Sequence, residues 1–272
     1  MKSLVFVDSD GTLKNNDGII SDHTIEVLSK LKDNNIEVVI TTGRPRYHAL
    51  KVKNNSNASR YVISSNGAEI YDELEDEVIY AKYLDNKTIL KIYKIASKNN
   101  SICAFTIDNY EFVSDEVKNE HQRMLDKPLM KFLKENHVKQ IFIKSDTKEH
   151  ANKIYKKIGK LNSCKIANES PYFQTGVVEK KGIWFSVTHK DVNKGNAIKE
   201  LTSHLNIELD NTYGFGNDYN DIEMFKTVGH SIIMDNANED LKKLAKIVTK
   251  SNDEDGVAHL LEKLFLKKRK EK

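Results

Sequence analysis

Residues 4 to 13 read Leu-Val-Phe-Val-Asp-Ser-Asp-Gly-Thr-Leu, an apolar run that stops at two carboxylates and a glycine. Its first four residues are branched or aromatic, which is typical of a buried strand. Asp8 and Asp10 therefore fall just past the carboxyl end of that strand, at the edge where open α/β sheets bind ligands. A strand-end turn without any chemistry would use the same residue types. The rest of the chain has to distinguish these two interpretations.

Length and charge narrow the class of protein. The chain has 272 residues, enough for a sizeable core and two domains. Its net charge of +3 gives no general attraction to nucleic acid or to an anionic membrane. The apolar stretch before Asp8 is too short for a signal peptide, and no run reaches membrane-spanning length. Cys103 and Cys164 lack metal-ligand spacing and fit a reducing compartment. We expect a cytoplasmic protein, either a monomer or a small homo-oligomer.

Strand-like and helix-like segments alternate in the first and last parts of the chain. Ser21 caps one helical pattern, and Pro45 is suited to begin another. We expect further strands at 36–40, 61–64, 212–215 and 231–234, and a helix from Asp221. Such alternation is typical of βαβ units. It predicts an α/β fold with a Rossmann-like parallel-sheet core.

The middle of the chain shows a different succession of expected helices and strands. Beyond about Leu84 the pattern predicts helices at 88–96 and 147–158 and strands at 102–107, 111–113, 140–144 and 182–187. Trp184 lies in the last of these strands, and we expect it in the core. These segments indicate an α/β cap inserted into the core. The predicted domains are a core at 1–83 and 189–272 and a cap at 84–188.

Four short polar segments, which we call stations, follow expected strands or begin expected helices. They are Asp8 with Asp10, Thr42 with Gly43, Lys194 with Gly195, and the loop 216–221, Gly-Asn-Asp-Tyr-Asn-Asp. Taken singly, each has a plain alternative as a turn or as an exposed lysine. None of the nine histidines falls in a station, which disfavours histidine catalysis. Arg44, beside the second station, either orients that loop or faces solvent.

The order and context of the four stations resemble the motifs of the haloacid dehalogenase superfamily, and within it the Cof-type phosphatases with a large α/β cap. The strings DSDGTL, TTGR, NKG and GNDYNDIEMF carry this resemblance, which spans the whole chain. The stretches 65–68, 234–237 and 251–258 also look like that family's. Each string alone is weak, but their order and spacing together are specific.

The resemblance implies a Mg²⁺-dependent phosphomonoester hydrolase that acts on small phosphorylated metabolites through an aspartyl-phosphate intermediate. Asp8 would be the nucleophile, and Asp10 would protonate the leaving alcohol and then activate water. Because the transferring group is anionic and resists an anionic nucleophile, the site must neutralise charge. Four residues would bind the substrate's phosphate, namely Thr42, Gly43, Lys194 and Asn220.

The metal ligand set is where the chain departs from the family's usual pattern. The candidates are Asp8, Asp10, Asn217, Asp218 and Asp221, whose oxygens suit Mg²⁺. The family usually has Asp directly after the glycine of the acidic loop, where this chain has Asn217. Its amide oxygen can still ligate a metal, although with one negative charge fewer. Alternatively Asp218 takes over that contact, or Asp221 moves inward to the metal or steadies Lys194.

Several functional alternatives remain open. We expect the cap to choose the substrate, with sugar phosphates as the first candidate and nucleotides and pyridoxal phosphate as competitors. A phosphomutase or phosphotransferase would use the same chemistry with an alcohol in place of water. A phosphometabolite-binding protein with impaired turnover is favoured only by Asn217, and the intact Asp8 and Asp10 argue against it.

Overall fold

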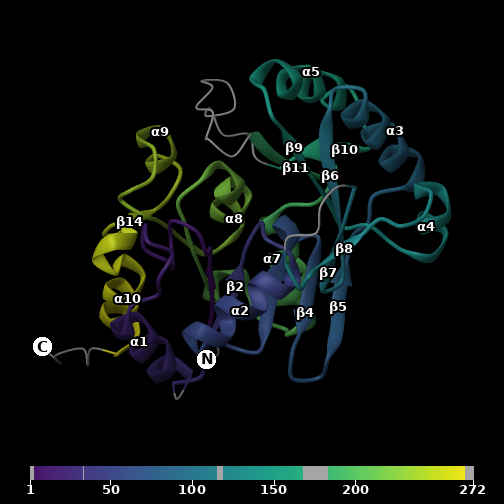
Figure 1. The fold of residues 1–272 in the computed structure, drawn as a ribbon. Helices are drawn as coiled ribbons and strands as arrows, with labels where there is room; N and C mark the ends of the chain where they lie inside the picture. Colours follow the sequence, from purple (N-terminus) through teal and green to yellow (C-terminus); the bar gives the residue numbers. More distant parts are fainter. Residues whose placement is uncertain (1–2, 33, 115–118, 168–182, 267–272) are drawn as a thin grey trace, which may run out of the picture. The chain divides into compact units, whose positions relative to one another are not determined.

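The computed structural model describes residues 3–32, 34–114, 119–167 and 183–266. The chain divides into two compact units (Figure 1). The core unit comprises Met1–Tyr80 and Asn193–Lys272, and the cap unit comprises Ala81–Val192. The cap is thus an insertion between two parts of the core, where the sequence predicted 84–188.

The core unit is built on an eight-stranded sheet. In sheet order its strands are β14 (Ile247–Val248), β13 (His230–Ile233), β12 (Thr212–Gly216), β1 (Ser3–Val7), β2 (Ile36–Thr41), β3 (Tyr61–Ser64), β4 (Glu69–Asp72) and β5 (Glu77–Ala81). The strands from β14 to β3 pair in parallel, and β4 pairs with β3 in the antiparallel sense. Because neighbouring parallel strands end at the same edge, the loops after β1, β2 and β12 lie together.

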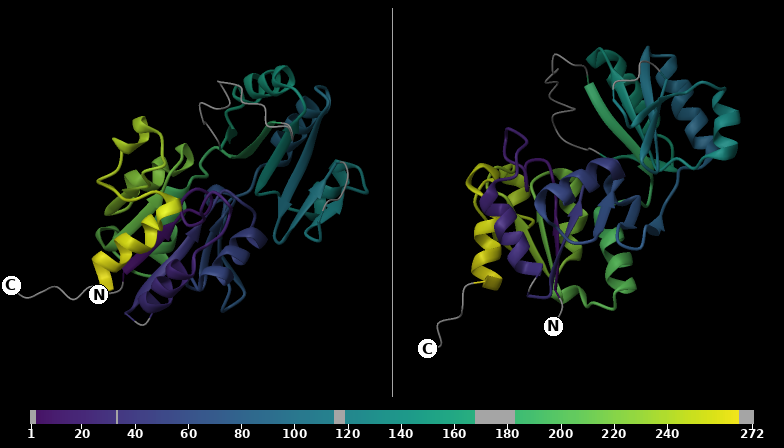
Figure 2. Two further views of the ribbon diagram at one scale, coloured as in Figure 1. Left: turned by 60° about the vertical axis from the view of Figure 1, so that its left-hand side comes forward. Right: turned by 60° about the horizontal axis from the view of Figure 1, so that its bottom comes forward.

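Helices cover both faces of this sheet (Figure 2). They are α1 (Asp22–Lys32), α2 (Arg46–Ser56), α7 (Lys194–His204), α8 (Ile222–Thr227), α9 (Glu239–Lys242) and α10 (Gly256–Leu261). The side chains of β1 alternate between the faces. Val5 and Val7 pack in a cluster with α1, α2 and α10, whereas Leu4 and Phe6 pack with α7, α8 and α9. This two-sided burial explains why the strand before Asp8 is apolar throughout.

The cap unit has a six-stranded mixed sheet of its own. In order the strands are β10 (Cys164–Ile166), β11 (Ile183–His189), β9 (Gln140–Ser145), β6 (Ser101–Ile107), β7 (Tyr110–Val113) and β8 (Gln122–Met124). All pairs are antiparallel except β7 with β8. The helices α3 (Asn86–Ser97), α4 (Leu129–Glu135) and α5 (Lys148–Ile158) share one hydrophobic cluster with the sheet. A separate core of this kind is what an inserted domain requires.

The prediction that Trp184 belongs to the core was wrong. Along β11 the neighbouring Phe185 and Val187 point into the cluster with the helices, so Trp184 projects from the opposite face of the sheet. Its side chain is half-exposed, and the Lys144 ammonium lies 5.9 Å from the ring centre. The apolar character of the run identified a strand but not the face that each side chain occupies.

Most predicted elements are present with ends shifted by a few residues. Ser21 caps α1 as expected, because its hydroxyl accepts a hydrogen bond from the backbone N–H of Thr24 at 3.0 Å. The sequence missed β4 and β5, which extend the core sheet beyond the parallel strands. The predicted start of the 182–187 strand at Gly182 lies outside the described residues. Within the described ranges, no helix has the length and apolar character that crossing a membrane requires.

Candidate active site

The carboxyl ends of three parallel strands bring three of the four stations to one edge of the core sheet. Asp8 follows β1, Thr42 follows β2 and Asn217 follows β12. The backbone N–H of Asp8 donates to the carbonyl of Phe215 at 2.9 Å, which continues the pairing of β1 with β12 past the end of the strand. The Asp8 side chain is therefore fixed at the centre of this edge, and it is only 6% exposed.

The fourth station, Lys194, begins α7 and reaches the same edge. Its ammonium donates to Oδ1 of Asp8 at 2.6 Å and to Oδ1 of Asp221 at 2.6 Å. Lys194 and Asp221 are both fully buried. The helix start is held by Asn193, whose side chain accepts the N–H of Asn196 at 2.7 Å. A buried ammonium needs this pairing, because an unpaired charge away from water is very unfavourable.

Burial and pairing shift the ionisation of this group of side chains. Burial raises the pKa of Asp8 to about 7, although the adjacent Lys194 ammonium opposes that rise. Burial also tends to lower the pKa of Lys194, but Asp221 and Asp8 outweigh it and the net shift is upward. Lys194 is thus a permanent cation beside Asp8, whose charge depends on pH and on any further cation that binds.

Asp10 differs from Asp8 because it is half-exposed. The Arg44 Nε donates to its Oδ2 at 2.9 Å, and the Lys14 ammonium lies 3.4 Å from Oδ1. Burial tends to raise the pKa of Asp10, but Arg44 and Lys14 outweigh it and lower the pKa. The structure therefore places Arg44 on the carboxylate of Asp10, a role that the sequence left open. Sequence reasoning missed Lys14, which follows the first motif on an ordinary polar stretch.

The acidic loop after β12 is organised around Asp221. Its Oδ2 accepts the backbone N–H of Asn217 at 2.9 Å and that of Asp218 at 3.1 Å, while its Oδ1 accepts from Lys194. Asp218 caps the following turn by accepting the N–H of Tyr219 at 2.8 Å, and burial raises the pKa of Asp218. Both oxygens of Asp221 are thus engaged within the protein. The geometry suits a residue that orients Lys194 and the loop.

The second station is a tight loop between β2 and α2. The Thr42 hydroxyl accepts the backbone N–H of Arg44 at 3.2 Å, and Thr42 itself is buried. At Gly43 the backbone lies against the amide of Asn66, so close that a Cβ would be 2.8 Å from Oδ1 of Asn66. That amide oxygen also accepts from Nδ2 of Asn220 at 3.0 Å. The loops that carry Gly43 and Asn220 are therefore linked through Asn66.

The oxygen atoms at this edge set the kind of metal that the site suits. Asn217 directs its Oδ1 toward the hydroxyl of Thr12, at 2.9 Å. Asp8 and Asp218 add carboxylate oxygens, and none of the predicted metal ligands is a histidine or a cysteine. Oxygen donors of this kind suit Mg²⁺. Within the described residues, no group of three or more His, Cys, Asp or Glu is arranged as a metal-binding cluster.

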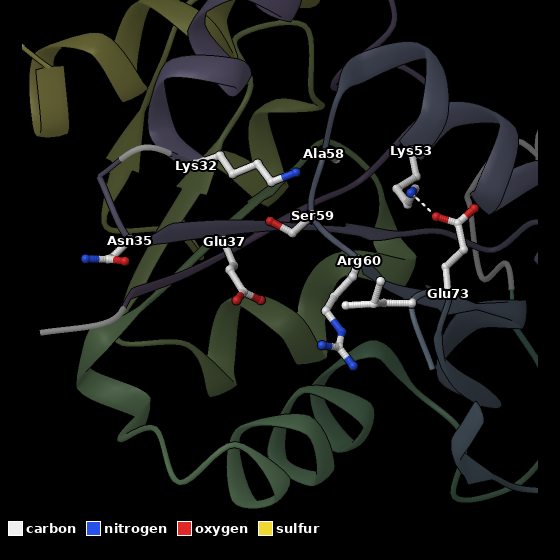
Figure 3. Close-up of a pocket in the computed structure, with 9 residues that line it drawn as sticks. Lys32, Asn35, Glu37, Lys53, Ala58, Ser59, Arg60 and Glu73 are labelled. Atoms are coloured by element: carbon white, nitrogen blue, oxygen red, sulfur yellow. Dashed lines mark hydrogen bonds and ion pairs between the residues drawn. The ribbon is translucent and has the colours of Figure 1, made fainter. Parts of the chain in front are cut away.

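A pocket of about 690 Å³ lies in the core unit away from these stations (Figure 3). Glu37 stands at the start of β2 and Arg60 directly before β3, so the pocket is at the amino ends of the strands. Lys53 and Glu73 form an ion pair in its wall. None of its lining residues belongs to a station. The pocket is therefore separate from the carboxyl-end edge that collects Asp8 and Lys194.

The arrangement at the carboxyl-end edge agrees with a known family. The sequence pattern of the haloacid dehalogenase-like hydrolases matches residues 5–261. The chain belongs to this family. Membership makes this hydrolase a haloacid dehalogenase-like phosphatase, and it implies a divalent metal, usually Mg²⁺. The oxygen donors at the edge fit such a cation.

Known relatives and solved structures align with nearly the full length of this hydrolase. It is 27% identical to 5-amino-6-(5-phospho-D-ribitylamino)uracil phosphatase YcsE of Bacillus subtilis, over 94% of this chain and 92% of the relative. It is 26% identical to phosphatase YwpJ of the same organism, over 96% and 99%.

Two solved structures confirm the fold of a parallel core sheet with an inserted mixed sheet. A haloacid dehalogenase-like hydrolase from Bacteroides thetaiotaomicron aligns with a TM-score of 0.83 at 23% identity, covering 97% of this chain and 100% of that one. The subclass IIB sugar phosphatase BT4131 aligns with a TM-score of 0.77 at 25% identity, covering 97% and 99%.

Proposed function

We propose that this hydrolase cleaves phosphomonoesters in two steps through a phosphoryl group carried on Asp8. The observation that carries the proposal is the buried Asp8 carboxylate, held by Lys194 beside the half-exposed Asp10. A buried carboxylate fixed at a sheet edge suits a nucleophile, because its position is set before substrate arrives. A carboxylate that reaches solvent suits proton exchange with an alcohol or water.

The two steps balance with these two carboxylates alone. In the first, an oxygen of Asp8 forms a bond to phosphorus, the ester P–O bond breaks, and protonated Asp10 gives its proton to the leaving alcohol. In the second, Asp10 takes a proton from water as that water attacks phosphorus, and the bond to Asp8 breaks. Inorganic phosphate leaves, Asp8 is again a free carboxylate, and Asp10 holds the proton that the first step had used.

In the resting enzyme Asp10 is ionised, which is the state that the second step requires of a base. Arg44 and Lys14 lower its pKa, which keeps it ready to act as a base. For the first step it must hold a proton. A phosphate dianion arriving next to Asp10 would raise its pKa and would also compete for the Arg44 guanidinium. Substrate binding itself therefore supports the protonation that the first step requires.

The remaining stations supply charge and hydrogen bonds for the phosphoryl group. Lys194 is cationic and cannot be released to solvent, so it can offset charge on the group as it transfers. Thr42 offers a hydroxyl, and Gly43 offers a backbone N–H just before a helix. Asn220 offers an amide donor. We assign these four residues to phosphate binding and Asp221 to the positioning of Lys194.

A divalent cation would be held by oxygens of Asp8, Asp10, Asn217 and Asp218. When bound, Mg²⁺ would neutralise negative charge between the nucleophile and the phosphate. Asp221 is a weaker candidate because Lys194 and two backbone N–H groups already occupy its oxygens. Asn217 can still ligate, since an amide oxygen has two lone pairs and Thr12 uses one of them.

We propose sugar phosphates as the first substrate class and the cap as the domain that selects among them. Two relatives support this class, since one is a sugar phosphatase and another acts on a phosphorylated ribitylamino compound. The cap sheet also carries a row of polar side chains on one face, four of which are buried. This cross-strand row lies on the face away from the helices and is polar throughout, with Gln122, Glu111, Thr106, Gln140, Thr188 and Lys165.

A phosphate-release screen tests the proposal. Purified protein is incubated with a panel of sugar phosphates, nucleotides and pyridoxal phosphate, with Mg²⁺ or with a chelator, and inorganic phosphate is measured. We expect release from at least one sugar phosphate, dependent on Mg²⁺ and absent in Asp8→Asn. Release from no compound would contradict hydrolysis, and transfer of the phosphoryl group to an added alcohol in preference to water would indicate a phosphotransferase.

A further inference from the structure

The turn between β3 and β4 has an unusual backbone. Ser65, Asn66 and Gly67 follow one another with φ angles of 52°, 60° and 96°. Glycine adopts this left-handed region freely and asparagine tolerates it, whereas serine there is disfavoured by roughly 1 kcal/mol or more. Such strain persists where the surrounding structure fixes it, and it occurs often at binding sites. We therefore asked what this turn holds in place.

The turn is fastened to two of the phosphate-binding stations. The backbone N–H of Asn66 donates to the Thr42 carbonyl at 3.0 Å, and that of Ser65 donates to the Arg44 carbonyl at 2.8 Å. Gly67 lies against the backbone of Asn193, at the start of the helix that carries Lys194, and a Cβ at Gly67 would collide with it. The three residues with positive φ angles thus fit between the loop after β2 and the start of α7.

This backbone conformation places the side chain of Asn66 between Gly43 and Asn220. It is 4% exposed and lies against the Cα of Gly43, where a Cβ would be 2.8 Å from its Oδ1 and 3.1 Å from its Nδ2. Its Oδ1 accepts a hydrogen bond from Nδ2 of Asn220 at 3.0 Å. The amide of Asn66 is therefore packed against Gly43 on one side and bonded to Asn220 on the other, with its Oδ1 as the acceptor.

We propose that Asn66 is a positioning residue that sets the amide orientation of Asn220 for phosphate binding. An asparagine amide has nearly the same shape when it is flipped, so packing alone does not choose between its nitrogen and its oxygen. With Oδ1 of Asn66 as the acceptor, Asn220 must turn its NH₂ group toward it, because only that group can donate. The second N–H on the same nitrogen is then available for an anion. This inference rests on the proposed role of Asn220 in phosphate binding.

The variant Asn66→Gly tests the inference, because glycine keeps the left-handed backbone and removes the acceptor. The readouts are KM for the best substrate of the screen and inhibition by inorganic phosphate with Mg²⁺ present. We expect both constants to rise roughly five- to tenfold, the usual value of one hydrogen bond. Asn206→Gly is the matched control, because Asn206 is an exposed residue with a similar φ of 53°. It should change neither constant.

A double-mutant cycle with Asn220→Ala separates positioning from a general loss of structure. If Asn66 acts through Asn220, adding Asn66→Gly to Asn220→Ala weakens phosphate binding by less than twofold more. Full additivity of the two effects, or wild-type constants in Asn66→Gly, would overturn the inference. Should Asn66→Gly fail to fold, Asn66→Ser gives the same cycle, since its side chain is too short to reach Asn220. A wild-type protein that releases phosphate from no substrate would instead refute the proposed function.

Discussion

The Lys194 ammonium lies 2.6 Å from Oδ1 of Asp8, and neither side chain has appreciable contact with solvent. Buried ion pairs are poor stabilisers, because the loss of hydration offsets most of the attraction between the charges. An apolar pair at this place would serve the fold at least as well. The burial of two carboxylates and one ammonium together here therefore points to a functional requirement, and Asp8→Asn should separate activity from stability.

The first prediction is that Asp8→Asn abolishes phosphate release while the protein stays folded. The change removes the nucleophilic oxygen but keeps the size of the side chain and an acceptor for Lys194. Lys194 also retains Asp221, so we expect a loss of unfolding free energy of no more than about 2 kcal/mol. Phosphate release and a thermal melt check this together. A folded Asp8→Asn variant that turned over at the wild-type rate would exclude covalent catalysis by Asp8.

The second prediction concerns Lys194→Met, which should lower kcat by roughly 100-fold or more and should also destabilise the protein. Without the ammonium, Asp8 and Asp221 are two buried carboxylates with no cation between them. By analogy with other broken buried pairs, we expect a loss of about 3–5 kcal/mol at neutral pH.

The destabilisation by Lys194→Met should depend on pH in a defined direction. Burial already raises the pKa of Asp8 to about 7 with Lys194 present, and removal of Lys194 raises it further. A carboxyl group with a folded-state pKa above its unfolded value binds a proton more tightly when folded, so its contribution is favourable at low pH and is lost as pH rises. Urea titrations should show a smaller difference from wild type at pH 5 than at pH 8. An equal difference at both values would contradict the assigned burial of these charges.

The third prediction is that Arg44→Gln shifts the alkaline limb of the kcat/KM profile to higher pH. Arg44 lowers the pKa of Asp10, and its loss lets that pKa rise. Protonated Asp10 is needed to expel an alcohol, so the variant keeps its acid to higher pH. With p-nitrophenyl phosphate, whose leaving group needs no proton, the shift should be absent. The same shift with both substrates would mean that Arg44 acts on another group.

The sequence predicted the sheet edge well because apolar strands and polar loops leave a strong local signal. The run before Asp8 and the strand at 61–64 are both present as predicted, and the parallel pairing follows from the alternation of elements. The position of Arg44 on Asp10 could not be predicted, since it joins two loops that are 34 residues apart. The positive φ angle of Ser65 leaves no residue signature, whereas Asn66 and Gly67 are residue types that tolerate such angles.

The last prediction is that Asn217→Asp strengthens Mg²⁺ binding to the substrate-free enzyme. If the amide oxygen of Asn217 is a direct ligand, the metal lacks one of the usual negative charges and binds weakly until a phosphate supplies more. A carboxylate at this position should then improve the binding free energy by roughly 1 kcal/mol or more, and metal and phosphate should couple less strongly than in wild type. Thr12 can donate to either side chain, so the loop should keep its conformation. Calorimetric Mg²⁺ titrations check this, with Asp218→Asn as the competing variant. Unchanged affinity in Asn217→Asp together with a large loss in Asp218→Asn would assign the ligand to Asp218.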